Sequence, residues 1–246
     1  MLVEMVVDVV MGQCLTKYNE NMIPHYKTLR SGKLVKQILA GEVGVMPSDT
    51  LYGLMGSALL SAIVERIYKL RRRATKKPMI ILISGLRDLE KFGVRLNKNQ
   101  KKFLQQYWPG TVSVVLKCFG KKWTYLHRGG GTLAFRWPKY AGLEKLLKQT
   151  GPLVAPSANW AGEPQAETVR AAQKYFGGGV DFYVDVGKLA GKPSTLVRLD
   201  GGGRPMVLRE GSVKMEEVKN EAFLLRHSRP SNPSSSGLTR GSRKEQ

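Results

Sequence analysis

The sequence predicts an α/β protein, because segments with the period of a helix alternate with short apolar runs that are typical of buried strands. Its 246 residues are 42% hydrophobic and 24% charged, a composition that suits a folded chain with a substantial core. The apolar runs, such as Met79–Ile83, are far shorter than the ~20 residues needed to cross a bilayer. Cys14 and Cys118 are too few for a disulfide scaffold, so we expect reduced thiols in a cytoplasmic protein.

Helix and strand signals follow one another along the chain. A helix is expected over Ser31–Ala40, capped by its first residue and ended by Gly41, and a buried strand follows over Glu42–Met46. An amphipathic helix is expected over Ser61–Arg72, before a buried strand over Met79–Ser84. The further helices expected are Asn99–Tyr107, Tyr140–Gln149 and Glu167–Phe176, and the further strands are Thr111–Cys118, Thr132–Trp137, Leu153–Ala155, Phe182–Val186, Thr195–Leu199 and Met206–Arg209.

Both ends of the chain differ in composition from the middle. The first ten residues are apolar but carry Glu4 and Asp8 and no basic residue, which is the opposite of a signal peptide. Whether translation starts at Met11 or Met22 instead of Met1 is left open by the sequence. From His227 onward the chain is rich in Ser, Pro, Gly and Arg, which predicts a disordered tail. We therefore expect an N-terminal extension over 1–21, one folded domain over 22–221 and a basic tail over 222–246.

The chain is strongly basic, with 40 Lys and Arg against 19 Asp and Glu, a formal net charge of +21. Such a charge indicates a polyanionic partner or substrate, such as nucleic acid or nucleotide phosphates, although a solvated basic surface is the simpler alternative. Seven basic residues and no acid lie between positions 66 and 77, whereas the tail holds five basic residues and one acid. The tail therefore explains little of the excess charge.

The first candidate binding segment is Pro47–Leu54, at the end of a predicted strand. Thr50 and Tyr52 supply hydroxyl groups, and Gly53 allows a ligand to approach the backbone. An ordinary strand-to-helix turn capped by Thr50 explains the same residues equally well.

The second candidate is the basic run Arg71–Pro78, at the C-terminal end of a predicted helix. One guanidinium group can donate two parallel hydrogen bonds to the oxygens of a phosphate or carboxylate group. The run therefore favours an anionic ligand. Cations also complement the helix dipole, but that effect accounts for one or two charges, not for the whole run.

The third candidate is Ala155–Asn159, where Ser157 and Asn159 can hydrogen-bond a substrate, although an Asx turn is the simpler interpretation. The three histidines are scattered, which argues against a Ser–His nucleophile and against a protein-held zinc ion, so no metal site is expected. Arg136 and Arg209 end predicted strands, and Ser194 lies near a strand start; each is weak evidence alone.

No Gly-rich phosphate loop and no dinucleotide-binding turn occurs in the sequence. Taken in order, however, several stretches resemble the YrdC-like family of threonylcarbamoyl-AMP synthases, in its short single-domain type. The stretches are Pro47–Leu54, Arg71–Pro78, Trp108–Thr111, Thr132–Pro138, Gly151–Asn159, Pro193–Val197 and Leu208–Gly211.

The resemblance implies a twisted mixed sheet flanked by helices, with a basic concave face. It implies an enzyme that makes L-threonylcarbamoyladenylate from ATP, L-threonine and bicarbonate, with release of pyrophosphate. Mg²⁺ would be carried with ATP, a transferase complex would pass the group to tRNA, and double-stranded RNA or tRNA is a further implied partner. The alternatives are an RNA-binding module without catalysis and a paralogue with another acyl or carbamoyl substrate.

The resemblance also assigns roles to single residues. It places catalysis on Arg71, Arg73, Ser157 and Asn159, ATP binding on Arg73, Lys77, Thr132, Ser157, Ser194 and Arg209, and threonine binding on Thr50, Tyr52, Arg136 and Ala155. The sequence departs from the family pattern at three positions. Arg71 stands where the family has a catalytic lysine, Ser48 replaces a threonine and Ala74 replaces a proline. Because arginine lacks the compact charge of lysine, the first departure bears on rate more than on ligand class.

Overall fold

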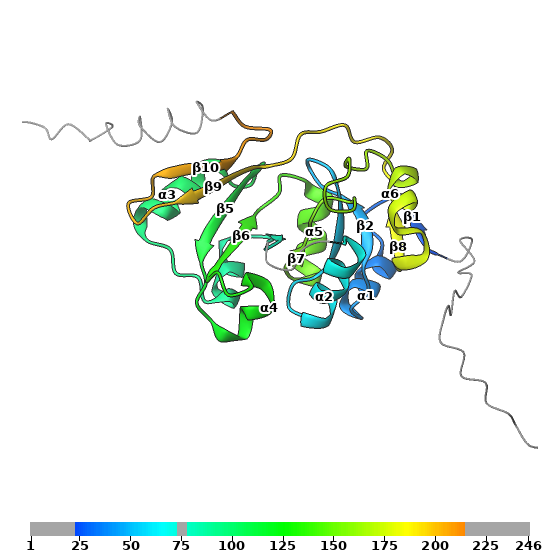
Figure 1. The fold of residues 1–246 in the computed structure, drawn as a ribbon, viewed down its shortest axis with the longest axis horizontal. Helices are drawn as coiled ribbons and strands as arrows, with labels where there is room; N and C mark the ends of the chain where they lie inside the picture. The colour runs from blue at the N-terminus through cyan, green and yellow to red at the C-terminus, as the bar shows by residue number, and fades with distance from the viewer. Residues whose placement is uncertain (1–22, 73–77, 215–246) are drawn as a thin grey trace, which may run out of the picture.

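The computed structural model describes residues 23–72 and 78–214, which form a twisted mixed sheet flanked by helices (Figure 1). This confirms the predicted α/β class. The helices are α1 (Gly32–Leu39), α2 (Ser61–Leu70), α3 (Lys98–Tyr107), α4 (Thr124–His127), α5 (Ala141–Thr150) and α6 (Val169–Phe176). The strands are β1 (His25–Tyr26), β2 (Gly44–Pro47), β3 (Tyr52–Ser57), β4 (Ile80–Leu82), β5 (Val112–Lys117), β6 (Thr132–Arg136), β7 (Leu153–Val154), β8 (Phe182–Val184), β9 (Thr195–Leu199) and β10 (Pro205–Arg209). The expected extension, the tail and both domain limits lie outside the described residues.

The strands form one sheet in the order β1-β8-β2-β3-β7-β4-β6-β5-β9-β10. Parallel pairs, such as β4 with β6 and β5 with β9, alternate with antiparallel pairs, such as β2 with β3 and β5 with β6. Strands far apart in sequence therefore become neighbours. This brings the start of β9 beside the start of β5, and the end of β6 beside the end of β4.

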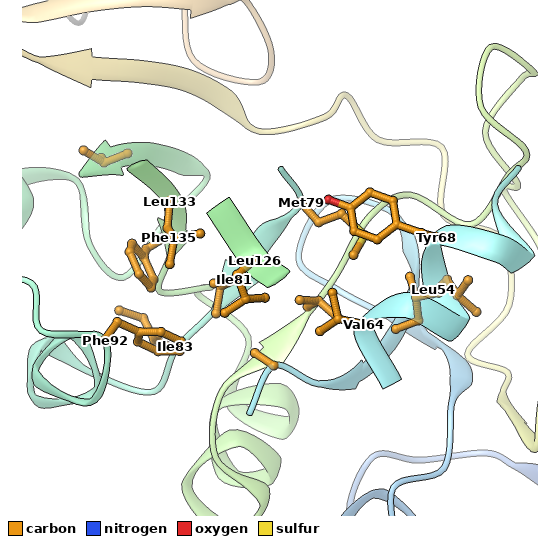
Figure 2. Close-up of a cluster of buried hydrophobic side chains, with 14 of the residues drawn as sticks. Leu54, Val64, Tyr68, Met79, Ile81, Ile83, Phe92, Leu126, Leu133 and Phe135 are labelled. Atoms are coloured by element: carbon orange, nitrogen blue, oxygen red, sulfur yellow. The ribbon is translucent and has the colours of Figure 1, made fainter. Parts of the chain in front are cut away.

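Successive strand residues point to opposite faces of the sheet, so the core has two layers. Ile81 belongs to the layer beneath α2, α3, α4 and α6, and Leu82 to the layer beneath α1 and α5. Figure 2 shows part of the first layer, in which Leu54, Val64 and Tyr68 gather around α2 and Phe92 and Phe135 lie further along the sheet. Fully burying such a side chain stabilises the fold by about 1.5–3 kcal/mol.

The predicted helices and strands are present, with ends that differ by a few residues. The main difference is β3, which no expected strand covers, because the residues after Pro47 were expected to form a polar turn. The turn is only four residues long and closes a hairpin between β2 and β3. β3 contains two glycines, which weakens its strand signal. Packing requires the glycine at Gly56, since a Cβ there would lie 2.6 Å from Cγ2 of Ile63, whereas a Cβ at Gly53 would clash only with the flexible end of Met55, at 2.9 Å.

Candidate functional site

A pocket of about 160 Å³ lies where the β2–β3 turn meets the ends of β6, β7 and β10 and the start of β9. Its polar lining comes from segments that are far apart in the sequence. The lining residues with polar side chains are Ser48, Thr50, Tyr52, Arg71, Arg136, Ser157, Gln165, Ser194 and Arg209. The sheet order therefore brings together most of the residues that the sequence singled out.

The β2–β3 turn is organised by Ser48, whose side chain is 8% exposed. Its Oγ accepts hydrogen bonds from the backbone N–H groups of Thr50 and Leu51, both at 3.2 Å, and lies 3.0 Å from Thr50 Oγ1. Gly191 packs so closely above this turn that a Cβ there would lie 2.1 Å from the Thr50 carbonyl oxygen. The Thr50 hydroxyl is therefore held in a fixed position in the pocket wall.

Arg136 ends β6 and forms a buried ion pair with Asp49, in which Arg136 Nη1 donates to Asp49 Oδ1. The two side chains are 5% and 7% exposed. Burial lowers the pKa of the Arg136 guanidinium, and the charge of Asp49 opposes that effect. Asp49 also accepts the Lys139 backbone N–H at 3.0 Å, while Arg136 Nε is buried and finds no hydrogen-bond partner within residues 23–72 and 78–214. Such an unsatisfied donor is costly unless a ligand accepts its hydrogen bond.

Arg71 follows α2, and its guanidinium is tied to the loop after β7. Its Nε donates to the Asn159 carbonyl oxygen at 3.0 Å, and its Nη2 donates to Asn159 Oδ1 at 3.1 Å and Ser157 Oγ at 3.3 Å. The amide nitrogen of Asn159 donates to the carbonyl oxygens of Trp160 and Glu163. Arg71 and Asn159 therefore fix the loop that places Ser157 in the pocket.

The opposite wall of the pocket is formed by β9 and β10. Arg209 Nη2 donates to the Ser194 carbonyl oxygen at 2.8 Å, and the hydroxyls of Ser194 and Ser113 lie 2.8 Å apart. Gly211 allows the chain to pass closely, because a Cβ there would lie 2.1 Å from the Pro193 carbonyl oxygen. The arrangement leaves an exposed arginine and a buried hydroxyl on one side of the pocket.

Tyr52 lines the pocket, but its hydroxyl is engaged elsewhere. It donates to the Gly187 carbonyl oxygen at 2.7 Å and accepts the Val186 backbone N–H at 3.0 Å. Desolvation by burial raises the pKa of Tyr52, and the Val186 hydrogen bond partly opposes this. Tyr52 thus joins β3 to the loop after β8, and the structure does not present its hydroxyl as a threonine-binding group.

The structure brings Thr50, Arg71, Arg136, Ala155, Ser157, Ser194 and Arg209 to one pocket. It does not bring Thr132 there. Thr132 pairs with Lys117 at the opposite end of β6 from Arg136, about 13 Å away along a strand. Asn159 does not line the pocket. Its side-chain amide nitrogen donates to the carbonyl oxygens of Trp160 and Glu163 and so holds the loop. Arg73 and Lys77 lie outside the described residues.

Three polar lining or supporting residues were not given a role from the sequence. Asp49 and Ser48 lie within the Pro47–Leu54 segment, but the partner of Asp49 is Arg136, 87 positions along the chain, so no local pattern indicates the ion pair. Gln165 lies in a loop with no local signal, and its place in the pocket follows only from the tertiary fold.

Within residues 23–72 and 78–214, no three His, Cys, Asp or Glu side chains gather as metal ligands would. None of the helices in the same ranges has the length and hydrophobicity that crossing a membrane requires.

A twisted mixed sheet with a pocket of arginines and hydroxyls at its strand ends defines an α/β protein equipped to hold a small anionic ligand. Comparison with known proteins identifies its family. The model of the Sua5/YciO/YrdC family, described as "Telomere recombination", matches residues 36–211. The chain belongs to this family.

Several relatives carry the name of a synthase. A Mycobacterium tuberculosis protein, provisionally named a threonylcarbamoyl-AMP synthase, is 31% identical over 75% of this chain and 85% of its own length. The threonylcarbamoyl-AMP synthase of Pyrococcus abyssi is 29% identical over 78% of this chain, which spans only 54% of that protein. The structure of P. abyssi Sua5 complexed with L-threonine superposes with a TM-score of 0.73 at 26% identity, covering 81% of this chain and 60% of that one.

Proposed function

We propose that the protein is an L-threonylcarbamoyladenylate synthase, which uses ATP, L-threonine and bicarbonate and releases pyrophosphate. Relatives of this name, and a related structure that holds L-threonine, support the assignment. The observation that carries it in this chain is the convergence of Thr50, Arg136, Ser157, Ser194 and Arg209 on one pocket.

The reaction needs a site that tolerates several negative charges. The amine of threonine and bicarbonate form a carbamate with loss of water. A carbamate oxygen then attacks the α-phosphorus of ATP, and the bond to the β-phosphate breaks as pyrophosphate leaves. Both reactants are anions, so fixed cations and hydroxyls offset their repulsion and stabilise the charge that develops on pyrophosphate. Holding the two reactants in contact lowers the barrier further.

The two walls of the pocket suit two substrates. On one wall, Arg136 Nε is a buried donor without a partner among the described residues, placed to donate to the threonine carboxylate beside the Thr50 hydroxyl and the Ala155 backbone. On the other wall, Arg209 and Ser194 are suited to ATP phosphates. Ser157 lies between them, fixed by Arg71. Arg73 and Lys77 are further groups that we propose to bind the phosphates of ATP.

Further parts of the proposal concern partners. Mg²⁺ enters with ATP as the counter-ion of its phosphates. The product is handed to a threonylcarbamoyl transferase complex that modifies tRNA, and the protein works in the cytoplasm, as its low cysteine content favours.

The test is mass spectrometry of the products formed from ATP, bicarbonate and a mixture of amino acids, together with pyrophosphate release. We expect threonylcarbamoyladenylate and a release that needs both threonine and bicarbonate. Arg209→Gln should raise the KM for ATP about tenfold or more, because it removes an exposed pocket cation without disturbing the core. Arg170→Gln on the exposed side of α6 is the matched control and should leave the kinetics unchanged.

Two results would overturn the assignment. A well-folded sample that releases no pyrophosphate would leave the RNA-binding alternative. A product that carries another amino acid or acyl group would identify a paralogue with a different substrate.

A further inference from the structure

The connection between β8 and β9 runs across the sheet and ends at the pocket. β8 is the second strand in the sheet order and β9 is the ninth, so the connection passes from one side of the sheet to the other (Figure 1). Its last two residues, Pro193 and Ser194, line the pocket. We call residues 186–193 the strap. The path of the strap determines part of the pocket wall.

Few backbone hydrogen bonds hold the strap, and most of its residues are exposed. The Leu189 N–H donates to the Glu167 carbonyl oxygen at 2.7 Å. The Val186 N–H donates to the side chain of Tyr52, which is a pocket residue. Segments with few such bonds and much exposed backbone open locally at a small cost in free energy. The position of the strap therefore depends on the small number of groups that hold it.

The Tyr52 hydroxyl is one of these groups. It accepts the Val186 N–H at 3.0 Å and donates to the Gly187 carbonyl oxygen at 2.7 Å. A tyrosine hydroxyl has a single proton, and here that proton is used for the strap. The ring of Tyr52 is fully buried, so the hydroxyl is held in a fixed place. Loss of the hydroxyl would release both backbone groups at the start of the strap.

The strap meets the pocket again at Gly191. A Cβ at Gly191 would lie 2.1 Å from the Thr50 carbonyl oxygen, so the strap and the β2–β3 turn are in tight contact. Thr50 and Tyr52 both line the pocket, and one residue separates them in the sequence. The strap is thus bonded to Tyr52 and packed against Thr50. A displacement at the first contact is therefore passed on to the second.

We propose that Tyr52 is a positioning residue, whose hydroxyl fixes the strap and thereby holds Thr50 in place to bind L-threonine. The inference rests on the proposed function for the identity of the ligand, whereas the contact between Tyr52 and the strap does not. Tyr52 then affects the affinity for threonine without touching it. The expected signature is a raised KM for threonine with little change in kcat, because the loss weakens ground-state and transition-state binding alike.

The test compares Tyr52→Phe with the matched variant Tyr125→Phe in the full-length protein. Tyr125 also donates its hydroxyl to a backbone carbonyl oxygen, that of Ala58 at 2.9 Å, but it does not line the pocket. Amide hydrogen exchange in the strap should be about fivefold faster in Tyr52→Phe and unchanged in Tyr125→Phe. The KM for L-threonine should rise about fivefold in Tyr52→Phe alone, while the melting temperature falls by similar amounts in both variants.

Gly191→Ala tests the second contact while the Tyr52 hydroxyl stays in place. The added methyl group does not fit against the Thr50 carbonyl oxygen, so the strap or the turn must shift. The KM for threonine should therefore rise in this variant too. Gly32→Ala is the control, because a Cβ at Gly32 meets nothing within 4 Å, and it should leave the KM unchanged.

A raised KM in Tyr52→Phe without faster exchange in the strap would mean that Tyr52 contacts threonine itself, and would overturn the proposal. So would faster exchange with an unchanged KM, or an equal rise of the KM in Tyr125→Phe, which would indicate a general loss of stability. A parent protein that neither binds L-threonine in calorimetry nor releases pyrophosphate would overturn the proposed function. The exchange comparison would still decide whether Tyr52 holds the strap.

Discussion

The pocket and the lobe that α3, β5 and α4 form (residues 91–128) are both rich in positive charge, but they hold it in different ways. In the pocket, Arg71 and Arg136 are 3% and 4% exposed and are fixed by hydrogen bonds to neighbours. In the lobe, residues such as Lys101 and Lys121 are exposed and have no acidic partner in the described part of the chain. A buried, oriented cation can recognise a small ligand at the cost of desolvation, whereas an exposed one attracts any polyanion at long range. Substitutions in the two regions should therefore differ in kind.

The largest expected effect is at the Arg136–Asp49 pair. Arg136→Met leaves Asp49 buried without its partner, so the free energy of unfolding should fall by about 3–5 kcal/mol in urea titrations. Adding Asp49→Leu removes the orphaned charge and should restore most of that loss. The double variant should still lack threonine-dependent pyrophosphate release. If it retained that activity with an unchanged KM for threonine, Arg136 would not anchor the substrate.

This pair also marks the limit of what the sequence predicts. Arg136 was identified because it ends an apolar strand, and Thr50 because its segment follows a strand. The contact between Arg136 and Asp49, which is next to Thr50, depends on the order of β2, β3, β7, β4 and β6 in the sheet, which no local pattern specifies. The same limit explains Tyr52, whose hydroxyl is engaged by a loop 134 positions away, and Gln165, which has no signal of its own.

The fold itself was largely predictable, because burial gives its elements a clear period. α2 and α6 place apolar residues on one face, and β4 is a continuous apolar run. β3 was missed because its glycines lower strand propensity, although tight packing against Ile63 requires the glycine at Gly56. Thr132 was placed in the pocket by analogy with its family position, whereas strand geometry puts it at the other end of β6.

The next effect in size concerns Arg71. Arg71→Lys replaces a planar fork by a single ammonium, which cannot keep the bonds to the Asn159 carbonyl, the Asn159 side chain and Ser157 together. We expect the free energy of unfolding to fall by about 1–2 kcal/mol and the rate of pyrophosphate release to change with it. The control is Arg72→Lys, at an exposed guanidinium that lies 3.5 Å above the Trp160 ring and should cost less than about 1 kcal/mol. Equal effects would mean that the loop does not depend on Arg71.

A smaller effect, dependent on pH, is expected at Asp88, which lies outside the pocket. Burial would raise its pKa, but hydrogen bonds from Lys91 and Ser84 outweigh burial and hold the pKa below its usual range. A carboxyl with a lowered pKa stabilises the fold above about pH 4, and this stabilisation is lost as the pH falls through the folded-state value. Asp88→Asn should therefore be about 1–2 kcal/mol less stable than the parent at pH 7 and nearly equal to it at pH 2–3. A difference that stays constant from pH 7 to pH 2 would contradict this explanation.

The smallest effect should come from single lobe lysines. Lys101→Gln and Lys121→Gln alter exposed side chains without acidic partners in the described ranges, so the free energy of unfolding should stay within about 0.5 kcal/mol of the parent. The removal of one like charge from a crowded basic surface slightly reduces repulsion, so any change should be toward higher stability at low salt and should vanish at high salt. Thermal unfolding at two salt concentrations measures this directly. A clear loss of stability would mean that the lobe lysines, like the pocket arginines, help to hold the fold together.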